Sequence, residues 1–153
     1  MLFSCYHSPM SKIYLAYGSN MNLNQMKYRC PNAVLLGNAT LENWRLMFRR
    51  KSRPVATIEK ETGCTVPVVL WEITEECEDS LDVYEGYPTL YTKVDVPVEF
   101  NGKLITAMAY VMTPGKELGR PPEDYYNTIL QGYRDNRIDP APLNEAVSYS
   151  ASS

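Results

Sequence analysis

The segment TEECEDSLDVYEGYP, residues 74–88, contains a glutamate in a position that helix energetics disfavour. Cys77, Leu81 and Tyr84 follow one another at helical spacing and predict the buried face of a helix. Glu85 comes four residues after Leu81, so it projects from that same face, and it lies in the last turn, where the helix dipole opposes a negative charge. Burial and the dipole both favour the protonated form, so we expect a raised pKa and a role in acid–base chemistry.

Other interpretations of the acidic residues in this helix stay open at the level of sequence. Glu85 can turn towards solvent or pair with an arginine, and the helix pattern is as compatible with that structural role as with a catalytic one. Glu78 and Asp82 fall on the opposite side of the predicted helix, where a solvated face is expected. We therefore predict that these two residues take no part in chemistry.

A short polar turn is the second feature with chemical potential. In IYLAYGSNMNLNQMKYRC, residues 13–30, an apolar strand ends at Tyr17, the turn Gly18-Ser19-Asn20 follows, and Asn22 caps a helix. Backbone N–H groups at such a corner point into one small space, where they can hold an anion. Glycine at the start of the turn allows a ligand to approach closely. Most strand–turn–helix corners hold only water, so the turn alone favours that simpler interpretation.

The single histidine, His7, lies near the N-terminus. Ser-His-Asp triads, Cys-His pairs and histidine-rich metal sites are therefore excluded, and acid–base chemistry falls to carboxylates, tyrosines or lysines. The four cysteines show no C-x-x-C spacing, which argues against a zinc site or a redox motif. Two disulfides would suit a secreted protein, but the start of the chain makes a poor signal peptide, so free thiols in the cytoplasm are expected at Cys5, Cys30, Cys64 and Cys77.

Composition limits the kinds of partner. The chain has 153 residues, a net charge of −3 and 44% hydrophobic residues, with 12 tyrosines. This balance is typical of one globular domain and argues against a broad nucleic-acid-binding surface. No apolar run approaches the ~20 residues of a membrane span, so no membrane partner is expected. We predict a disordered leader over 1–11, a single domain over 12–145 and a loose polar tail over 146–153.

The order of the expected elements predicts an α+β fold, with a small, mixed, strongly curved sheet or barrel of about six strands and helices at its rim. Asn101-Gly102 is the strongest hairpin signal, and a bulge is expected near Gly37-Asn38. Glu61, Thr62 and Gly63 are expected to form a turn. The six strands are expected over 13–17, 33–50, 54–60, 65–74, 92–100 and 103–112.

Two of these motifs together resemble the γ-glutamylcyclotransferase family. YLAYGSNM at 14–21 is followed by LDVYEGYP at 81–88, and further segments from RCPNA to PPEDYYNTILQGY extend the resemblance over about residues 12–134, in the family's order. The YGSN motif alone is a weak signal, but its combination with LDxxEGYP at this spacing is specific. The resemblance implies the family's small mixed barrel with a side cavity, in agreement with the order of the elements.

The resemblance also implies an enzymatic reaction. The family releases an amine or amino acid from a γ-glutamyl compound while the glutamyl part cyclises to 5-oxoproline. Glu85 matches the family's catalytic glutamate and is expected to act as general acid and base. No metal or cofactor is required. The residues expected to bind the substrate are Tyr17 and the turn residues Gly18, Ser19, Asn20 and Met21, with Tyr91 and Tyr125 as pocket tyrosines; Tyr126 replaces Tyr125 if the register shifts by one.

Several properties stay open within this resemblance. The leaving group can be an amino acid or an amine, and a non-catalytic module that only binds a small carboxylate or γ-glutamyl ligand is the alternative function. The basic stretch RRKSR at 49–53 is interpreted as a solvated strand end rather than an anion site. A cytoplasmic location is expected, with a small-molecule γ-glutamyl substrate, no nucleic acid, and a monomer or a homodimer.

Overall fold

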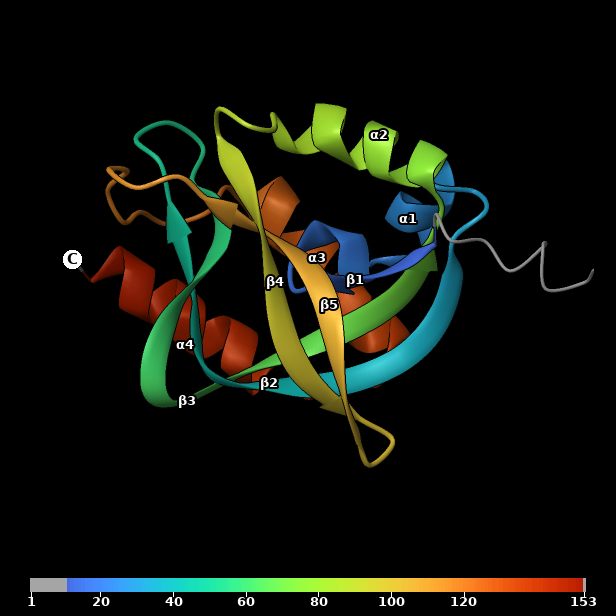
Figure 1. The fold of residues 1–153 in the computed structure, drawn as a ribbon. Helices are drawn as coiled ribbons and strands as arrows, with labels where there is room; N and C mark the ends of the chain where they lie inside the picture. The colour runs from blue at the N-terminus through green and yellow to red at the C-terminus, as the bar shows by residue number, and fades with distance from the viewer. Residues whose placement is uncertain (1–10, 153) are drawn as a thin grey trace, which may run out of the picture.

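In the computed structural model, which describes residues 11–152, five strands close into a barrel (Figure 1). Neighbouring strands around the barrel are antiparallel, except that β1 and β5 run parallel. The barrel closes through one residue pair between β1 and β5, Tyr14 and Met108, and one between β2 and β4, Thr40 and Glu99. Alternate side chains of each strand point into one core. The order around the barrel is β1 (Lys12–Ala16), β3 (Val55–Ile73), β2 (Val34–Arg49), β4 (Tyr91–Phe100) and β5 (Lys103–Met112).

The helices lie outside the barrel, so the expected α+β architecture with rim helices is confirmed. Figure 1 shows α2 across one end of the barrel, with α1 beside it, and α4 on the flank formed by β2 and β3. A short 3-10 turn, η2 (Ser19–Met21), follows β1 and packs on α3. The helices are α1 (Leu23–Arg29), α2 (Glu75–Glu85), α3 (Glu123–Asp135) and α4 (Ala141–Ala151).

Local sequence signals define several element boundaries as predicted. The Asn22 side chain accepts a hydrogen bond from the N–H of Gln25 and so caps α1. Asn101 and Gly102 both have positive φ, 51° and 80°, as a two-residue hairpin turn between β4 and β5 requires. The expected irregularity near Gly37 is present as a register shift between β2 and β3.

The barrel has five strands instead of about six, because the turn expected at 61–63 does not form. β3 runs without interruption through this segment and pairs with β2 along almost its whole length. Gly63 takes a φ of 89°, and a second register shift lies between Glu42 and Trp44 on β2. Together they bend the paired strands instead of ending them. The chain reverses only at 50–54, between β2 and β3, where a break between two strands was also expected.

The prediction of a loose polar tail over 146–153 is wrong for the described residues. This segment continues α4, in which Leu143, Ala146 and Ser150 are buried. Their spacing places them on one helix face, which packs on β2. The hydroxyl of Ser150 accepts a hydrogen bond from the N–H of Phe48 at 2.8 Å, so even a polar residue of this face satisfies a buried backbone donor. Residues 1–10 of the predicted leader lie outside the described residues.

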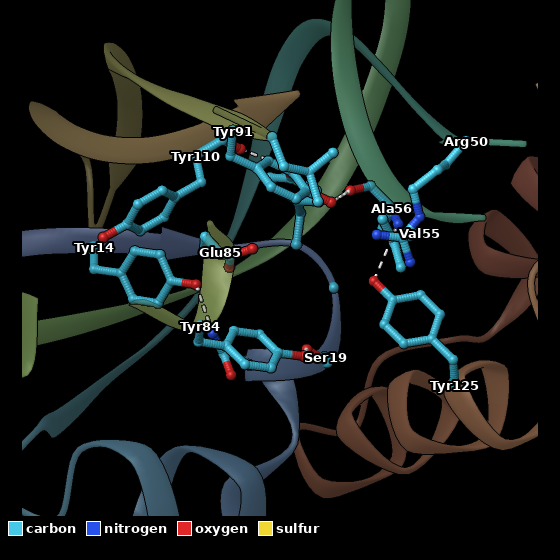
Figure 2. A pocket seen from close by; sticks show the side chains of 14 residues that line it. Tyr14, Ser19, Arg50, Val55, Ala56, Tyr84, Glu85, Tyr91, Tyr110 and Tyr125 are labelled. Carbon is cyan, nitrogen blue, oxygen red and sulfur yellow. Dashed lines mark hydrogen bonds between the residues drawn. The ribbon is translucent and has the colours of Figure 1, made fainter. Parts of the chain in front are cut away.

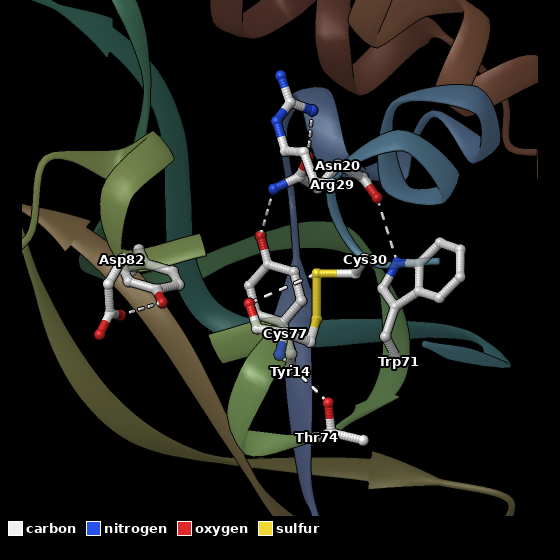
Figure 3. Close-up of a disulfide and its surroundings, with 9 residues drawn as sticks. Tyr14, Asn20, Arg29, Cys30, Trp71, Thr74, Cys77 and Asp82 are labelled. Carbon is white, nitrogen blue, oxygen red and sulfur yellow. Dashed lines mark hydrogen bonds between the residues drawn. A yellow bond between two sulfur atoms is a disulfide. The ribbon is translucent and has the colours of Figure 1, made fainter. Parts of the chain in front are cut away.

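The cysteines also differ from the prediction of free thiols. Cys30, at the C-terminal end of α1, forms a disulfide with Cys77 in the first turn of α2. Cys64 is free, and Cys5 lies outside the described residues. The disulfide joins positions 47 residues apart in sequence, so it connects the two helices at one end of the barrel directly (Figure 3). In the part of the chain that the structure describes, no helix is long and apolar enough to cross a membrane.

Candidate active site

A cavity of about 230 Å³ opens beside the barrel, between the turn after β1, the end of α2 and the start of β3. Its walls are largely aromatic, and Figure 2 shows the rings arranged around the carboxyl group of Glu85. Tyrosine suits such a cavity because its ring is apolar while its hydroxyl can donate and accept hydrogen bonds. Six tyrosines line it: Tyr14, Tyr17, Tyr84, Tyr91, Tyr110 and Tyr125.

Glu85 is the carboxylate of this cavity. It is the last residue of α2, because Gly86 takes a left-handed conformation with φ of 66° and ends the helix. Burial raises the pKa of Glu85 to about 7, while the nearby guanidinium of Arg29 partly opposes this rise. The rise expected from sequence is therefore present, with burial as its main cause. A carboxyl group with this pKa can both accept and return a proton near neutral pH.

The turn after β1 contributes Gly18, Ser19 and Asn20 to the cavity. The N–H groups of Ser19 and Asn20 begin the 3-10 helix and have no partner within it. A Cβ atom on Gly18 would lie 3.3 Å from the Cβ atom of Ala56, a tight contact, and 3.6 Å from the hydroxyl oxygen of Tyr125, so a side chain here would fill the space between these two cavity residues.

Met21, which was predicted to bind substrate, does not line the cavity. Its N–H donates to the carbonyl of Gly18 at 3.0 Å, and its side chain is fully buried. A Cβ atom on Gly132 of α3 would lie 2.9 Å from the Cβ atom of Met21, so the methionine packs closely against that helix. Met21 therefore anchors the turn to α3, and its backbone donor is already used.

The side chain of Asn20 fixes the turn from within. Its amide nitrogen donates to the hydroxyl of Tyr14 at 3.0 Å, and its amide oxygen accepts from Arg29 at 2.8 Å. The indole N–H of Trp71 donates to the backbone carbonyl of Asn20 at 3.1 Å (Figure 3). Because these groups are buried and mutually satisfied, Asn20 positions the turn and leaves its backbone N–H for a ligand.

The hydroxyl groups of the pocket tyrosines differ in whether a proton is available for a ligand. Tyr17 and Tyr91 donate to the backbone carbonyls of Tyr110 and Ala56, so their protons are used within the fold. Tyr125 accepts a hydrogen bond from the N–H of Ala56 at 3.0 Å, which leaves its own proton free to point into the cavity. Burial raises the pKa of Tyr17, Tyr91 and Tyr125, so all three stay neutral phenols at physiological pH.

Tyr125, and not its neighbour Tyr126, is the pocket residue of α3. The hydroxyl of Tyr126 donates to the side chain of Asn144, at the start of α4, and Tyr126 does not line the cavity. The register that places Tyr125 in the cavity is thereby resolved. Tyr17 and Tyr91, which were predicted to bind the substrate, also line the cavity. Their hydroxyl groups connect it to β5 and β3 through the hydrogen bonds to Tyr110 and Ala56.

Tyr84 lies at the edge of the cavity instead of in the core. It was assigned to the buried face of α2, but 42% of its surface is exposed. Its hydroxyl is 2.9 Å from the hydroxyl of Ser19, and the guanidinium of Arg29 lies 3.5 Å from the centre of its ring. Tyr84 therefore bridges the end of α2 and the turn, and it covers the side of the cavity that contains Glu85 (Figure 2).

Glu78 and Asp82 face two lysines instead of a solvated surface. Lys93 of β4 contacts both carboxylates, at 2.7 and 2.8 Å, and Lys12 contacts Glu78 at 2.9 Å. The hydroxyl of Tyr110 donates to Asp82 at 2.6 Å. Burial alone would raise the pKa of Glu78, but the hydrogen bonds from the two lysines outweigh it and lower this pKa. Neither acid lines the cavity, and both have structural partners, one of which, Tyr110, is itself a cavity residue. Their non-catalytic role stays a prediction.

Seven cavity residues were not assigned to the site from the sequence: three tyrosines, Arg50, and the apolar residues Val55, Ala56 and Leu90. Tyr14, Tyr84 and Tyr110 were not identified as site residues, although Tyr84 directly precedes Glu85 in the motif that carries the resemblance. Nothing in the sequence around Tyr110 indicates that it lies in the cavity, because only the closure of the barrel brings β5 there. Arg50, interpreted as part of a solvated strand end, lines the cavity. In the described part of the chain, no cluster of three or more metal-ligating side chains is present.

Comparison with known proteins agrees with this geometry. The model of the family described as "Gamma-glutamyl cyclotransferase, AIG2-like" matches residues 14–128. A mouse protein named γ-glutamylcyclotransferase is 31% identical over 136 residues, which cover 82% of this chain and 72% of the relative. A human protein of the same name is 31% identical over 138 residues, covering 84% and 73%.

A solved structure shares the fold. A protein titled γ-glutamyl cyclotransferase superimposes with a TM-score of 0.79 and 29% identity, over 90% of this chain and 86% of the solved chain. The resemblance suggested by YGSN and LDxxEGYP is therefore confirmed, and with it the mixed barrel. The family and its named members support a cyclotransferase function that acts on a small molecule. The chain belongs to the γ-glutamyl cyclotransferase, AIG2-like family.

Proposed function

We propose that this enzyme cyclises the γ-glutamyl group of a small γ-glutamyl amino acid or amine to 5-oxoproline and releases the amine, with Glu85 as general acid and base. The observation that supports this assignment is the position of Glu85, whose pKa is raised to about 7, in the same cavity as the turn Gly18–Asn20. Neither feature alone would suffice, because buried carboxylates and strand–turn–helix corners are both common. Their meeting in one cavity supplies a proton acceptor beside backbone donors.

The reaction begins with the substrate's own α-amine. The neutral amine attacks the γ-carbonyl carbon of the same molecule, and ionised Glu85 accepts a proton from its nitrogen as the new bond forms. Because nucleophile and carbonyl belong to one chain, ring closure is intramolecular, and the cavity has only to hold the folded conformer. The new C–N bond closes a five-membered ring, and the carbonyl oxygen becomes an oxyanion.

The second half of the reaction reverses the proton transfer. Protonated Glu85 donates its proton to the departing nitrogen, the bond from the γ-carbonyl carbon to that nitrogen breaks, and the oxyanion returns to a carbonyl. The products are 5-oxoproline and the free amine, and no water is consumed. A pKa near 7 suits both halves, since the same group must accept a proton and then lose it at neutral pH.

Donors around the cavity would stabilise the negative charges of the substrate and of the intermediate. The N–H groups of Ser19 and Asn20 are the proposed partners of the α-carboxylate, of the oxyanion, or of both. The hydroxyl of Tyr125 adds a donor on the opposite wall, because its oxygen is already occupied by the N–H of Ala56. Tyr17, Gly18 and Tyr91 are proposed to shape the cavity around the glutamyl chain.

The direct test is release of 5-oxoproline from a panel of γ-glutamyl dipeptides and γ-glutamyl amines, measured by chromatography with mass detection. We expect stoichiometric 5-oxoproline and free amine from at least one member. The alternative is a binding module in the same cavity, and it predicts no turnover of any member while 5-oxoproline still binds. A pure binder of anions has little use for a buried carboxylate beside the anion site, which favours the enzyme. The cytoplasmic location and the oligomeric state remain predictions from sequence.

A further inference from the structure

The cavity contains a positive charge that the proposed reaction does not use. Arg50 follows the last residue of β2 and lines the cavity together with Val55 and Ala56 of β3. Figure 2 shows it on the Tyr125 side, whereas Tyr14 and Tyr110 lie on the other side of Glu85. The charge of Arg50 acts on the pKa of Tyr125, which it lowers against the larger effect of burial, and the charge that acts on Glu85 is that of Arg29. Arg50 therefore belongs to the wall opposite Tyr14.

The neighbouring basic residues have partners of a different kind. Arg49 forms an ion pair with Glu59 at 2.7 Å, and Arg53 forms one with Asp124 at 2.9 Å. Within residues 11–152, Arg50 forms no ion pair with a carboxylate, although it is the arginine that lines the cavity. In this basic stretch, the arginine of the cavity wall is thus the one whose charge has no acidic partner.

The guanidinium of Arg50 is held in place without being saturated. Its Nε donates to the carbonyl of Ser52 and its Nη2 to the carbonyl of Arg53, each at 2.9 Å. The backbone N–H of Arg50 donates to the carbonyl of Glu117 at 2.8 Å, which fixes the end of β2. A guanidinium has five N–H donors, so the Nη1 group and one proton of Nη2 remain. These two adjacent nitrogens form the edge that binds a carboxylate through two parallel hydrogen bonds.

We propose that Arg50 is a specificity-determining residue that binds a carboxylate on the leaving half of the substrate. This inference rests on the proposed function. The glutamyl carboxylate and the oxyanion are assigned there to the turn N–H groups beside Glu85, so the leaving half extends from the reacting atoms towards the remaining wall. An amino acid as leaving group carries a carboxylate one carbon away from the scissile nitrogen, whereas a simple amine does not. Arg50 therefore selects γ-glutamyl amino acids over γ-glutamyl amines.

The test uses two substrates that differ in this one group, γ-glutamylalanine and γ-glutamylethylamide. Wild type is expected to turn over γ-glutamylalanine with a kcat/KM about 10- to 100-fold higher, as one charge-assisted contact allows. In Arg50→Met this preference disappears, mainly through KM: γ-glutamylalanine loses about 10- to 100-fold in kcat/KM and γ-glutamylethylamide at most about threefold. Arg50→Lys keeps a point charge but loses the fork, and it restores part of the preference.

A matched control separates specificity from damage to the loop. Arg53→Met removes a neighbouring arginine whose partner is the exposed Asp124, and we expect it to keep the wild-type preference. If Arg50→Met lowers kcat/KM equally for both substrates, Arg50 holds the glutamyl half or only the loop, and the proposal is overturned. An unchanged preference for the alanine compound overturns it as well.

Binding measurements keep this inference independent of turnover. Calorimetric titration of Glu85→Gln with the same two compounds measures the carboxylate preference without chemistry. Tighter binding of γ-glutamylalanine that is lost in the Glu85→Gln, Arg50→Met double variant supports Arg50 even if wild type turns over no compound, in which case only the proposed function fails. Equal binding of the two compounds by Glu85→Gln contradicts the role of Arg50 while leaving the proposed reaction untouched.

Discussion

The middle of α2 and its last residue use their carboxylates in opposite ways. Glu78 and Asp82 share Lys93 and lie outside the cavity, where they are part of the contact between α2 and the barrel. Glu85, three residues after Asp82, forms no ion pair with Lys12 or Lys93 in the described part of the chain and faces an aromatic cavity. Burial favours the neutral form in both places. At Glu78 two lysines reverse this effect, so the pKa of Glu78 falls while that of Glu85 rises to about 7.

The difference teaches how one helix can combine rigidity with reactivity. The disulfide between Cys30 and Cys77 and the two lysines attach the first turns of α2 to α1 and to the barrel. Because the start of α2 is fixed in this way, its last residue, Glu85, has a defined position in the cavity. Gly86 then ends the helix directly after Glu85. The carboxyl group therefore lies at the C-terminal end of α2, where the backbone changes direction.

The largest expected effect comes from removing the proton acceptor while keeping its shape. In Glu85→Gln, the amide can neither take the proton of the attacking amine nor return it, so 5-oxoproline formation should fall by about 100- to 10,000-fold in kcat. Ligand binding should persist, because the turn and the tyrosines are unchanged. Steady-state kinetics and calorimetric titration measure the two effects separately.

Asp79→Asn provides the matched control for that substitution. Asp79 lies on the same helix but is exposed, and its loss of charge should leave kcat within about twofold of wild type. Near-wild-type turnover by Glu85→Gln would show that another group transfers the proton and would remove the functional distinction between the two parts of α2.

Much of this arrangement was predictable because it depends on local sequence. The spacing of Cys77, Leu81 and Glu85 places all three on one face of α2, independently of the fold of the barrel. Asn22 and Asn101-Gly102 likewise act within a few residues of their own positions. The family motifs added what no local rule supplies, namely that the turn after the first strand and the end of α2 share one cavity.

The remainder could not be predicted because it depends on contacts between distant segments. Tyr110 reaches the cavity only because β5 closes the barrel against β1. Cys30 and Cys77 lie 47 residues apart, and nothing near either one indicates the other. Arg50 belongs to a basic run whose members look alike in sequence, and only the fold distinguishes the arginine in the cavity from those paired at the surface. The continuous β3 was not predicted because Gly63 and its neighbours have the residue types of a turn. In the structure, Gly63 lies where the strand bends.

A smaller effect, on stability, is expected at the ion pairs between the middle of α2 and β4. In Lys93→Met, Glu78 and Asp82 lose a shared partner at sites where their side chains are only 13% and 26% exposed. The free energy of unfolding should fall by about 1–3 kcal/mol, while kcat for 5-oxoproline formation stays within about threefold. Chemical denaturation with urea measures the loss, and Lys103→Met, at an exposed position of β5, serves as the control with little change.

The pH dependence of this stability difference follows from the sign of the shift. The folded-state pKa of Glu78 is lowered, so its ion pairs contribute fully above its unfolded pKa of about 4.3 and are lost as the pH falls through the folded value. The gap between wild type and Lys93→Met should therefore be wide at pH 7 and narrow in acid. A gap that stays constant down to acid pH would mean that Lys93 acts through packing instead of charge.

The smallest and most specific effect concerns Arg29, the positive charge that partly opposes the raised pKa of Glu85. With Glu85 as the base, kcat/KM should rise with pH through a midpoint of about 7 in wild type. Arg29→Met removes the opposing charge, so the midpoint moves upwards and kcat/KM at pH 6 falls by roughly threefold more than at pH 9. Arg29 also contacts Asn20 and the ring of Tyr84, and loss of those contacts lowers the rate equally at every pH. Arg29→Lys keeps the charge and should keep the midpoint, so a midpoint that is equal in all three proteins would assign the titration to a group other than Glu85.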